Sequence, residues 1–562
     1  MSEVVAPDPE LAEALWDLEP LVGGDGEVGV LARLEDAVAR AHALNQRYAG
    51  TLDDIDGSGL AELMEGIAAV YELAGRAGAY AALNFAADTS DPARGALMQK
   101  VRERSTEIQT ALLFVELQWA VLSDERAEEL LAAEGLDRCR HYLRTVRRYR
   151  PYLLSEPEER ILAEKQVTSS SAWSRLFAEH TSAIEVELPG GDGAEPQRTP
   201  LDVALGRLAS PDREVRRAAA DAVTAALAPG LRTRAYIFNT LVHDKAVEDR
   251  LRGYPTWLSA RNLANEVSDE SVQALVAAVR ARYEIPQRWY RLKADILGID
   301  RLADYDRSAE IGVEEERVSW SAARDTVLES FAPFSSELER LASRFFEERW
   351  IDAPARPGKR GGAFCAPTVP SEHPFLLLNY DGRRRDVITL AHELGHGLHF
   401  LLAGPRGIFE YDTPLTVAET ASVFAEQLVL ARLLERSPSP EARLSLLAED
   451  IERAVATVFR QVALHDFEEA VHHERRERGE LSIERFGELW AHHQEEMLGE
   501  AVEVTDGYRG WWSYIPHFIN SPGYVYAYAF GELLALSVYE RYLEEGPDFA
   551  PRYLEMLGAG GP

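Results

Sequence analysis

Cysteine, lysine and long apolar runs are all scarce in this sequence, and each scarcity excludes a class of protein. Only two of the 562 residues are cysteines. They are Cys139 and Cys365, too few and too far apart for a disulfide framework or a CxxC site. No run of 18 apolar residues occurs, so we expect no membrane span. The first ten residues lack the basic and apolar regions of a secretory signal. We therefore predict a cytoplasmic location.

Positive charge is also in short supply. The chain has 94 acidic and 60 basic residues, of which five are lysine, and the formal net charge is −34. Such a balance disfavours binding to phosphate backbones and to anionic lipid surfaces, so we expect neither nucleic acid nor a membrane as a partner. The apolar content of 46% is ample for a core, in several domains or in one large helical body.

The most informative stretch runs from Asp386 to Leu402 and holds the only His-Glu-x-x-His in the chain. The local sequence predicts a helix, with Asp386 as its N-cap. His392 and His396 are four residues apart and therefore lie on one face of that helix. Two neutral imidazoles so placed form half of a tetrahedral zinc site, and Glu393 lies close enough to hold a water molecule.

A bare His-Glu-x-x-His also arises by chance in long helical proteins, so the flanking residues matter. Apolar neighbours predict a buried helix, where two histidines and a glutamate need partners or a metal. Gly395 and Gly397 each cost roughly 1 kcal/mol relative to alanine in a helix interior. We infer that another stretch of backbone approaches the helix closely at these glycines.

A third ligand is needed, and the sequence excludes the metzincin arrangement. In that pattern a glycine and a third histidine would stand at positions 399 and 402. Those positions hold His399 and Leu402. His399 shares the face of His392 and His396, but a third ligand one turn further along would crowd a single helix. His399 therefore suits a supporting or substrate-side role better.

A glutamate from the next predicted helix is the preferred third ligand. Glu419 and Glu426 are seven residues apart and share a helix face. The alternative for Glu419 is a capping box with Thr416, although the following residues form a core helix. We favour Glu419 as ligand and Glu426 as the carboxylate that orients a ligand imidazole. Glu410 is a weaker candidate.

The rest of the chain is predicted to be mostly helical. Helical periodicity covers residues 11–180 and continues from about 210 to 346. Residues 184–200 contain the best hairpin, with its turn at 189–193, and mark a plausible boundary. Two further strands are expected at 363–367 and 375–380. A peptide could add to them as another strand, which would place Ala363 and Phe364 against substrate, or they could simply brace the zinc helix.

Several stretches of this chain resemble the zinc oligopeptidases of the thimet oligopeptidase and oligoendopeptidase F kind. The resemblance runs nearly end to end and favours the oligoendopeptidase F branch. It is carried by five stretches, at residues 16–21, 148–156, 350–366, 386–399 and 417–426. The last of them matches the segment where that family places its third zinc ligand and a following acidic residue. The first of the two falls on Glu419.

The resemblance implies a fold and a substrate class. The expected fold is mainly α, an elongated helical body split by a deep channel, with a small antiparallel β element beside the zinc helix. Residues 1–190 would form one wall and residues 191–562 the catalytic region. One Zn²⁺ per chain would lie on the channel floor, and the narrow channel would admit short flexible peptides.

The aromatic tract at residues 511–532 allows two interpretations. Composition alone indicates an aromatic core. In a zinc peptidase, tyrosine or histidine can also donate to the oxyanion of the tetrahedral intermediate. The resemblance assigns that role to His517 and Tyr528, with Tyr524 one turn before Tyr528. Tyr526 points elsewhere if the segment is helical and joins the other tyrosines if it is extended.

Together these patterns predict a zinc-dependent oligoendopeptidase in which Glu393 is the general base. The nearest alternative is a dipeptidyl or carboxy-end exopeptidase on the same scaffold. A peptide-binding protein without activity is a third possibility, against which the intact Glu393 argues, because a pure binder needs no base. The oligomeric state stays open.

Overall fold

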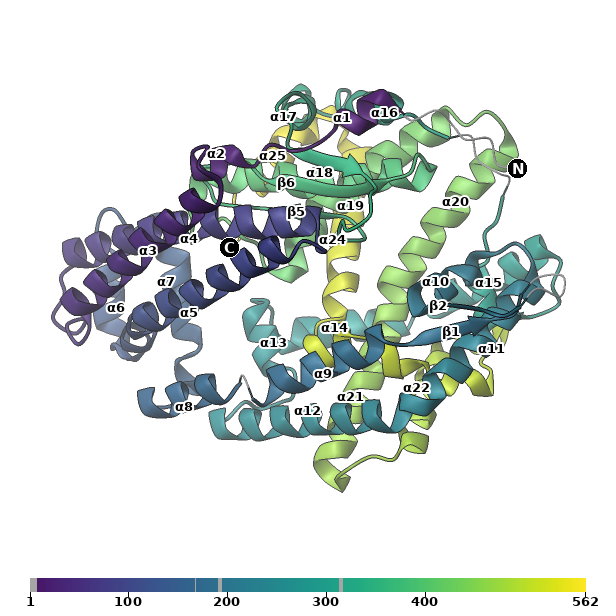
Figure 1. Ribbon diagram of the computed structural model, residues 1–562, viewed down its shortest axis with the longest axis horizontal. Helices are drawn as coiled ribbons and strands as arrows, with labels where there is room; N and C mark the ends of the chain where they lie inside the picture. The colour runs from purple at the N-terminus through teal and green to yellow at the C-terminus, as the bar shows by residue number, and fades with distance from the viewer. Residues whose placement is uncertain (1–7, 167, 191–194, 313–316, 562) are drawn as a thin grey trace. The chain divides into compact units, whose positions relative to one another are not determined.

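The computed structural model describes residues 8–166, 168–190, 195–312 and 317–561, which form two compact units. The first unit combines three separate stretches of chain, within Met1–Arg150, Glu314–Arg436 and Leu534–Pro562. The second unit comprises Pro151–Val313 and Ser437–Leu533. Both units are mainly helical, as predicted (Figure 1). The functional boundary expected at residue 190 stays a prediction, and the N-terminal seven residues lie outside the described chain.

The first unit takes its helices from the beginning, the middle and the end of the chain. Its helices are α1 Pro9–Glu13, α2 Glu19–Val22, α3 Gly26–Tyr48, α4 Gly57–Ala87, α5 Pro92–Val121, α6 Asp124–Leu131, α7 Arg140–Arg148, α16 Trp320–Phe331, α17 Ser336–Glu347, α18 Arg384–Ala403, α19 Leu415–Glu435 and α25 Ala550–Leu557. Its strands are β4 Ile351–Pro354, β5 Phe364–Ala366 and β6 Phe375–Tyr380. Helix α24, Tyr526–Glu545, runs across the boundary between the units.

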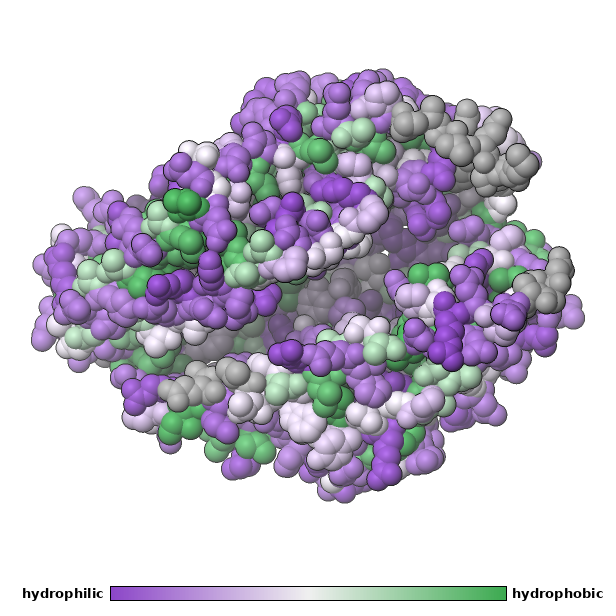
Figure 2. Space-filling model, in the orientation of Figure 1, coloured by the Kyte–Doolittle hydropathy of each residue, from purple (hydrophilic) through white to green (hydrophobic). Residues whose placement is uncertain are grey.

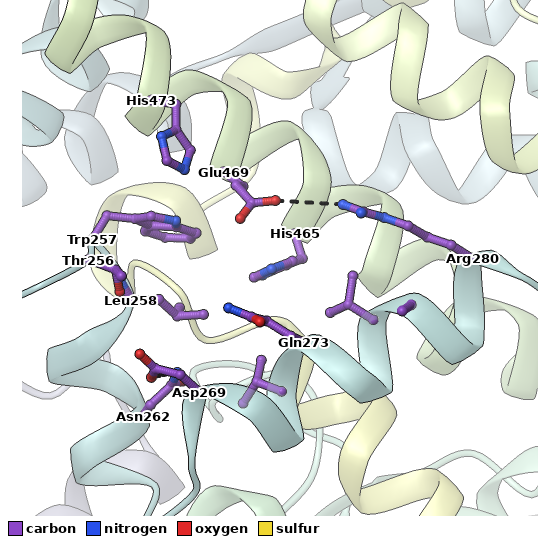
Figure 3. Close-up of a pocket in the computed structure, with 13 residues that line it drawn as sticks. Thr256, Trp257, Leu258, Asn262, Asp269, Gln273, Arg280, His465, Glu469 and His473 are labelled. Atoms are coloured by element: carbon purple, nitrogen blue, oxygen red, sulfur yellow. Dashed lines mark hydrogen bonds and ion pairs between the residues drawn. The ribbon is translucent and has the colours of Figure 1, made fainter.

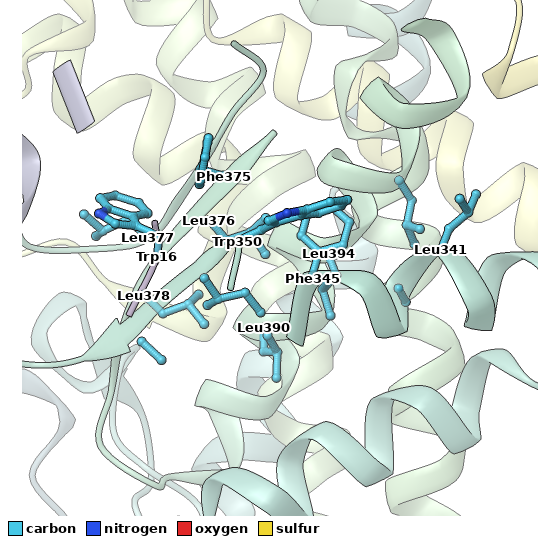
Figure 4. Packing of buried hydrophobic residues seen from close by; sticks show 14 of the residues in the cluster. Trp16, Leu341, Phe345, Trp350, Phe375, Leu376, Leu377, Leu378, Leu390 and Leu394 are labelled. Carbon is cyan, nitrogen blue, oxygen red and sulfur yellow. The ribbon is translucent and has the colours of Figure 1, made fainter. Parts of the chain in front are cut away.

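A three-stranded sheet supports the helix that carries the His-Glu-x-x-His motif. The strand order is β4-β6-β5, with β5 antiparallel and β4 parallel to β6. The antiparallel pair was predicted, but β4 was not, because its four residues lead into a loop rich in proline and glycine. The central strand β6 is almost wholly buried, and Figure 4 shows Leu376 and Leu378 among the side chains of Leu390 and Leu394 of α18.

The start of α18 differs by a few residues from the expectation. Asp386 is not the N-cap, since the helix begins at Arg384. Its carboxylate nevertheless satisfies free N–H groups, accepting from Asp381 at 2.9 Å and from Arg383 at 3.0 Å. The charge therefore lies in the first turn, where it also complements the helix dipole.

Helices α18 and α19 cross in direct contact at Gly395. A β-carbon added there would lie 2.5 Å from both the Ala421 carbonyl oxygen and the Ser422 Cα. The expected close backbone approach is therefore confirmed at Gly395. At Gly397 the expectation is wrong, since the neighbour is a side chain: an added β-carbon would lie 2.5 Å from the Phe345 ring.

The second unit surrounds a separate core. Its helices are α8 Glu156–Gln166, α9 Ser170–Ser182, α10 Leu201–Gly206, α11 Arg213–Leu227, α12 Leu231–Arg252, α13 Ser259–Ala264, α14 Asp269–Arg280, α15 Glu284–Leu297, α20 Pro440–Ala454, α21 Gln461–Arg478, α22 Ile483–Leu498 and α23 His517–Asn520. A π-helical segment, Val455–Arg460, joins α20 to α21. The strands are β1 Glu185–Leu188, β2 Gln197–Pro200, β3 Leu302–Ala303 and β7 Val502–Glu503.

The hairpin expected near residue 184 is confirmed, because β1 and β2 pair antiparallel from Glu185 opposite Pro200 to Leu188 opposite Gln197. Part of its turn, residues 191–193, lies outside the described chain. Much of the aromatic tract is core. Phe518, for example, stacks on Phe238 with ring centroids 5.8 Å apart.

Hydrophilic residues are spread over the face seen in Figure 2, as expected for a chain in which 27% of the residues are charged. Among the described residues, no helix combines the length and the apolar character that crossing a bilayer requires.

The contact at Gly395 can be tested against a second helical glycine. Gly395→Ala should lower the melting temperature and weaken metal retention, because overpacking a tight contact typically costs about 1–3 kcal/mol. Gly78→Ala in α4 is the matched control, since nothing lies within 4 Å of the added β-carbon. There alanine should be neutral or stabilise by up to about 1 kcal/mol. Thermal unfolding followed by circular dichroism compares the two, and equal melting temperatures would contradict the close contact.

Candidate active site

Three side chains from α18 and α19 bring their ligand atoms together in the first unit. The Nε2 atoms of His392 and His396 lie 3.2 Å apart. The Oε2 atom of Glu419 lies 3.5 Å from each of them. Ligands bound tetrahedrally to zinc at 2.0–2.2 Å stand about 3.3–3.6 Å from one another. The triangle therefore has the size that a zinc ion requires.

The alternative role for Glu419, a capping box with Thr416, does not hold. Helix α19 begins at Leu415, so Thr416 lies inside the helix and is not its N-cap. The Glu419 carboxylate instead accepts a hydrogen bond of 2.7 Å from the Ser422 hydroxyl through the same Oε2 that faces the histidines. Ser422 was not predicted from the sequence. Its position three residues after Glu419 places it on the same helix face, and that spacing could have indicated the contact.

A second carboxylate holds the outer nitrogen of His392. Glu426 Oε1 lies 2.5 Å from His392 Nδ1. With Nδ1 engaged in this way, the Nε2 lone pair of the neutral imidazole points to the triangle. Glu426 is 6% exposed, so the pairing takes place in a buried environment.

Nearby carboxylates give this group of side chains a negative electrostatic potential. Burial disfavours the charged form of His392, but nearby carboxylates outweigh burial and raise its pKa to about 9. These carboxylates belong to Glu426, Glu419 and Glu393. Metal ligation requires both imidazoles to be neutral, and the three carboxylates then leave an excess of negative charge that a divalent cation would balance. The donor set and its charge thus fit a zinc ion.

Glu393 lies in the same helical turn and is 6% exposed. Burial raises the pKa of its carboxyl to about 7, although the charge of His392 and a hydrogen bond from the Cys365 N–H favour the ionised form. A carboxyl group whose pKa lies near neutral pH can both accept and return a proton at physiological pH. The contact from Cys365 lies outside the reach of sequence reasoning, because it depends on how β5 packs against α18.

The weaker ligand candidates are placed elsewhere. Glu410 accepts a hydrogen bond of 3.0 Å from the N–H of His141 at the start of α7, so its carboxylate serves that helix end. His399 lies one turn beyond His396 and is 6% exposed. Burial lowers the pKa of His399 to about 4, which keeps the imidazole neutral. Its supporting role stays a prediction.

Strand β5 begins at Phe364, directly after Ala363, and lies at an edge of the sheet. In the order β4-β6-β5, β5 has β6 on one side and, within the described residues, no strand on the other. Ala363 and Phe364 are both half-buried. The edge offers backbone groups to an extended peptide, so binding of substrate there stays a prediction.

The second unit brings His517, Tyr524 and Tyr528 into one cluster. His517 Nε2 lies 3.3 Å from the Tyr528 hydroxyl, and the rings of Tyr524 and Tyr528 meet edge to face at 4.8 Å. All three side chains are half-buried. Their role beside the metal group stays a prediction.

Tyr526 does not belong to this cluster. Helix α24 begins at Tyr526, so the helical alternative holds and its side chain points away. It is 0% exposed, and its hydroxyl is bonded to Asn262 at 2.7 Å and to Asn265 at 2.9 Å. The prediction that Tyr526 binds substrate is therefore wrong.

A cavity of about 360 Å³ in the second unit is lined partly by histidine and carboxylate side chains, the residue types that also form the triangle of the first unit (Figure 3). Its wall includes His465 and Glu469, and Asp466 lies beside them. The Arg280 guanidinium binds both Asp466 oxygens, at 2.5 and 2.8 Å, and lies 3.6 Å from Glu469. Arginine already provides the positive charge there, so we assign no metal to this group.

Comparisons with known proteins agree with this geometry. The family model described as Peptidase family M3 matches residues 207–562, and the one described as Oligopeptidase F matches residues 119–185. Oligopeptidase PepF of Bacillus subtilis (strain 168) is 27% identical over 495 residues, 87% of this chain and 73% of that protein. The resemblance found in the sequence is thereby confirmed.

Two crystal structures share the fold. One, of a protein from Chlamydophila abortus, has a TM-score of 0.83 at 23% identity over 100% of this chain and 93% of that one. The other, oligoendopeptidase-F from Enterococcus faecium, has a TM-score of 0.71 at 23% identity over 94% of this chain and 91% of that one. Since the M3 model covers more than half of the sequence, the chain belongs to peptidase family M3 and is a metallopeptidase.

Proposed function

We propose that this protein is a zinc-dependent oligoendopeptidase that hydrolyses internal bonds of short, unstructured peptides. The observation that carries the proposal is the triangle of His392, His396 and Glu419, with Glu393 in the same helical turn. Membership of family M3 supplies peptide hydrolysis. The relatives named oligopeptidase and oligoendopeptidase support short substrates and internal bonds. Two free thiols agree with a cytoplasmic location.

In this proposal His392, His396 and Glu419 would hold one zinc ion. When bound, zinc supplies Lewis acidity, which polarises the peptide carbonyl and makes nearby water more acidic. Glu426 orients His392 through its hydrogen bond to Nδ1, and the Ser422 hydroxyl orients the Glu419 carboxylate. His399, one turn beyond His396, would support the site as a neutral, buried imidazole.

Glu393 acts as the general base. Its carboxylate takes a proton from the attacking water and then gives that proton to the leaving amine. The raised pKa of Glu393 suits both transfers. The free edge of β5 would align the peptide as an added strand along Ala363 and Phe364.

His517 and Tyr528 act as donors to the oxyanion that develops on the scissile carbonyl. The contact of 3.3 Å between His517 Nε2 and the Tyr528 hydroxyl keeps the two groups together. Tyr524 packs against Tyr528 and fixes the orientation of its ring.

The proposal is tested first at the base. Glu393→Gln should keep about one zinc per chain and lose nearly all turnover, because the amide cannot accept the proton. His396→Ala should lose both metal and turnover. Metal content by mass spectrometry and cleavage of a quenched fluorescent peptide measure the two properties. An active Glu393→Gln enzyme would end this mechanism.

Metal retention separates the two glutamates of α19. Glu419→Ala should abolish zinc retention during dialysis against a mild chelator, because it removes a ligand. Glu426→Ala should weaken retention by about 10- to 100-fold, as loss of a group that orients a ligand usually does. The reverse order would show that Glu426 is the ligand.

The aromatic cluster is tested with two neighbouring tyrosines. Tyr528→Phe should lower kcat and kcat/KM together by about 10²–10³, with KM nearly unchanged, because the hydroxyl acts in the transition state. Tyr526→Phe is the matched control. It should keep its activity and lose about 1 kcal/mol of stability, because its hydroxyl is bonded within the core. Full activity of Tyr528→Phe would leave the cluster as packing.

A further inference from the structure

The cavity of about 360 Å³ in the second unit contains polar groups that the proposed function does not use (Figure 3). Two helices contribute side chains spaced four residues apart: Val272, Val276 and Arg280 from α14, and His465, Glu469 and His473 from α21. Residues at this spacing share a helix face, so each helix turns one face to the cavity. The volume is at the lower end of the range of about 300–1,000 Å³ in which small-molecule sites fall. All the side chains that line it belong to the second unit.

Much of the cavity wall is apolar. Val272 and Val276 form part of it, together with Leu258 and the indole of Trp257. The indole stacks on the His472 ring, with centroids 4.4 Å apart, and Trp257 is 3% exposed. Burial of apolar ligand surface against such a wall is favourable. The wall therefore suits a ligand with an apolar body.

The charged groups of the wall are mainly acidic. Asp269 and Glu469 line the cavity, and Arg280 is the one arginine or lysine among the described residues that line it. The Arg280 guanidinium bonds both oxygens of Asp466, at 2.5 and 2.8 Å. It lies 3.6 Å from Glu469, which is beyond hydrogen-bond distance. An anionic ligand would thus meet two carboxylates and an arginine whose donors are engaged, whereas a cation would find an acceptor in Glu469.

His465 supplies a second acceptor, buried in the wall. The residue is 3% exposed, and its Nδ1 has no hydrogen-bond partner among the described residues. Burial lowers the pKa of His465, which keeps the imidazole neutral at physiological pH. In Figure 3 its ring points from α21 into the cavity, between Trp257 and Gln273. An unpaired buried polar atom costs free energy, and a donor from a bound ligand would recover that cost.

We propose that this cavity binds a small organic cation, a protonated primary amine on an apolar chain. Ligand atoms of His465 and Glu469 lie within 4.8 Å of each other, a gap that one ammonium nitrogen bridges with two hydrogen bonds. An ammonium has three donors and no acceptor, which matches a carboxylate and a neutral imidazole. The chain would lie along Val272 and Val276. None of the proposed zinc ligands takes part, so the proposal goes beyond the peptidase function.

Three probes of one size test the charge preference on the native enzyme. Pentylamine is the cation, pentanol is neutral and pentanoate is the anion. Titrations followed by ligand-detected NMR should find one pentylamine per chain, bound about 10- to 100-fold more tightly than pentanol, as expected for hydrogen bonds to a charged group. Pentanoate should bind more weakly than pentanol. Equal binding of the three probes, or no binding, would overturn the proposal and leave the cavity to water alone.

Variants then assign the amine to the cavity. Glu469→Gln should weaken pentylamine binding by about 10- to 100-fold and leave pentanol binding unchanged, because it removes charge and keeps size. His465→Phe should weaken pentylamine binding by about 10-fold. Glu477→Gln is the matched control, since Glu477 is an exposed residue of α21 outside the cavity wall, and it should bind as the native enzyme does. Native affinity in Glu469→Gln would place the amine elsewhere and overturn the proposal.

A capped lysine, Nα-acetyl-lysine amide, distinguishes the two sources of this chemistry. Binding of both pentylamine and the capped lysine would assign the site to lysine side chains as well as free amines, and binding of pentylamine alone to free amines. If Glu469→Gln fails to fold, the order of the three probes on the native enzyme still decides. An enzyme that cleaves peptides and does not bind pentylamine refutes only the role of the cavity. The proposed function fails separately, through an active Glu393→Gln enzyme.

Discussion

The contact between α18 and α19 at Gly395 is the constraint on which the active site depends. The two helices carry the three candidate ligands, the base Glu393 and the orienting side chains of Glu426 and Ser422, and they meet directly at Gly395. With a β-carbon at position 395, the backbone of α19 would have to withdraw from Ala421 and Ser422. Glu419 would then move away from the histidines, and the triangle of 3.2 and 3.5 Å would open. Backbone geometry rather than the ligands sets the size of the site.

The two units each hold a group of histidines and carboxylates, but the charges around the two groups differ. In the first unit, the carboxylates of Glu393, Glu419 and Glu426 surround two histidines, and their charges raise the pKa of His392. In the second unit, the acids beside His465 are held by Arg280. A cation is thus required in one place and already present in the other. Residue type and proximity alone would make both groups candidate metal sites. The charge balance distinguishes them, because an arginine is paired with the group of the second unit.

Sequence reasoning reached the helices, the hairpin, the strands at β5 and β6 and the family, because each has a local signature. His392, Glu393 and His396 were readable from spacing on a single helix. Glu419 needed the next helix, and the structure adds its distances to both histidines. The parallel strand β4 and the Cys365 N–H contact depend on packing between distant segments, and no local pattern reports them. Tyr526 was misassigned because the start of α24 decides which tyrosines share a face.

The composition of the first unit has a consequence for synthesis on the ribosome. Its core includes Phe424 of α19, whose ring stacks on Tyr553 of α25 with centroids 4.2 Å apart. Tyr553 follows the whole second unit in the chain, so it leaves the ribosome more than a hundred residues after α19. Until then the helix that carries Glu419 lacks part of its packing surface. The nascent chain therefore completes the packing of α19 late, after the whole second unit has been synthesised.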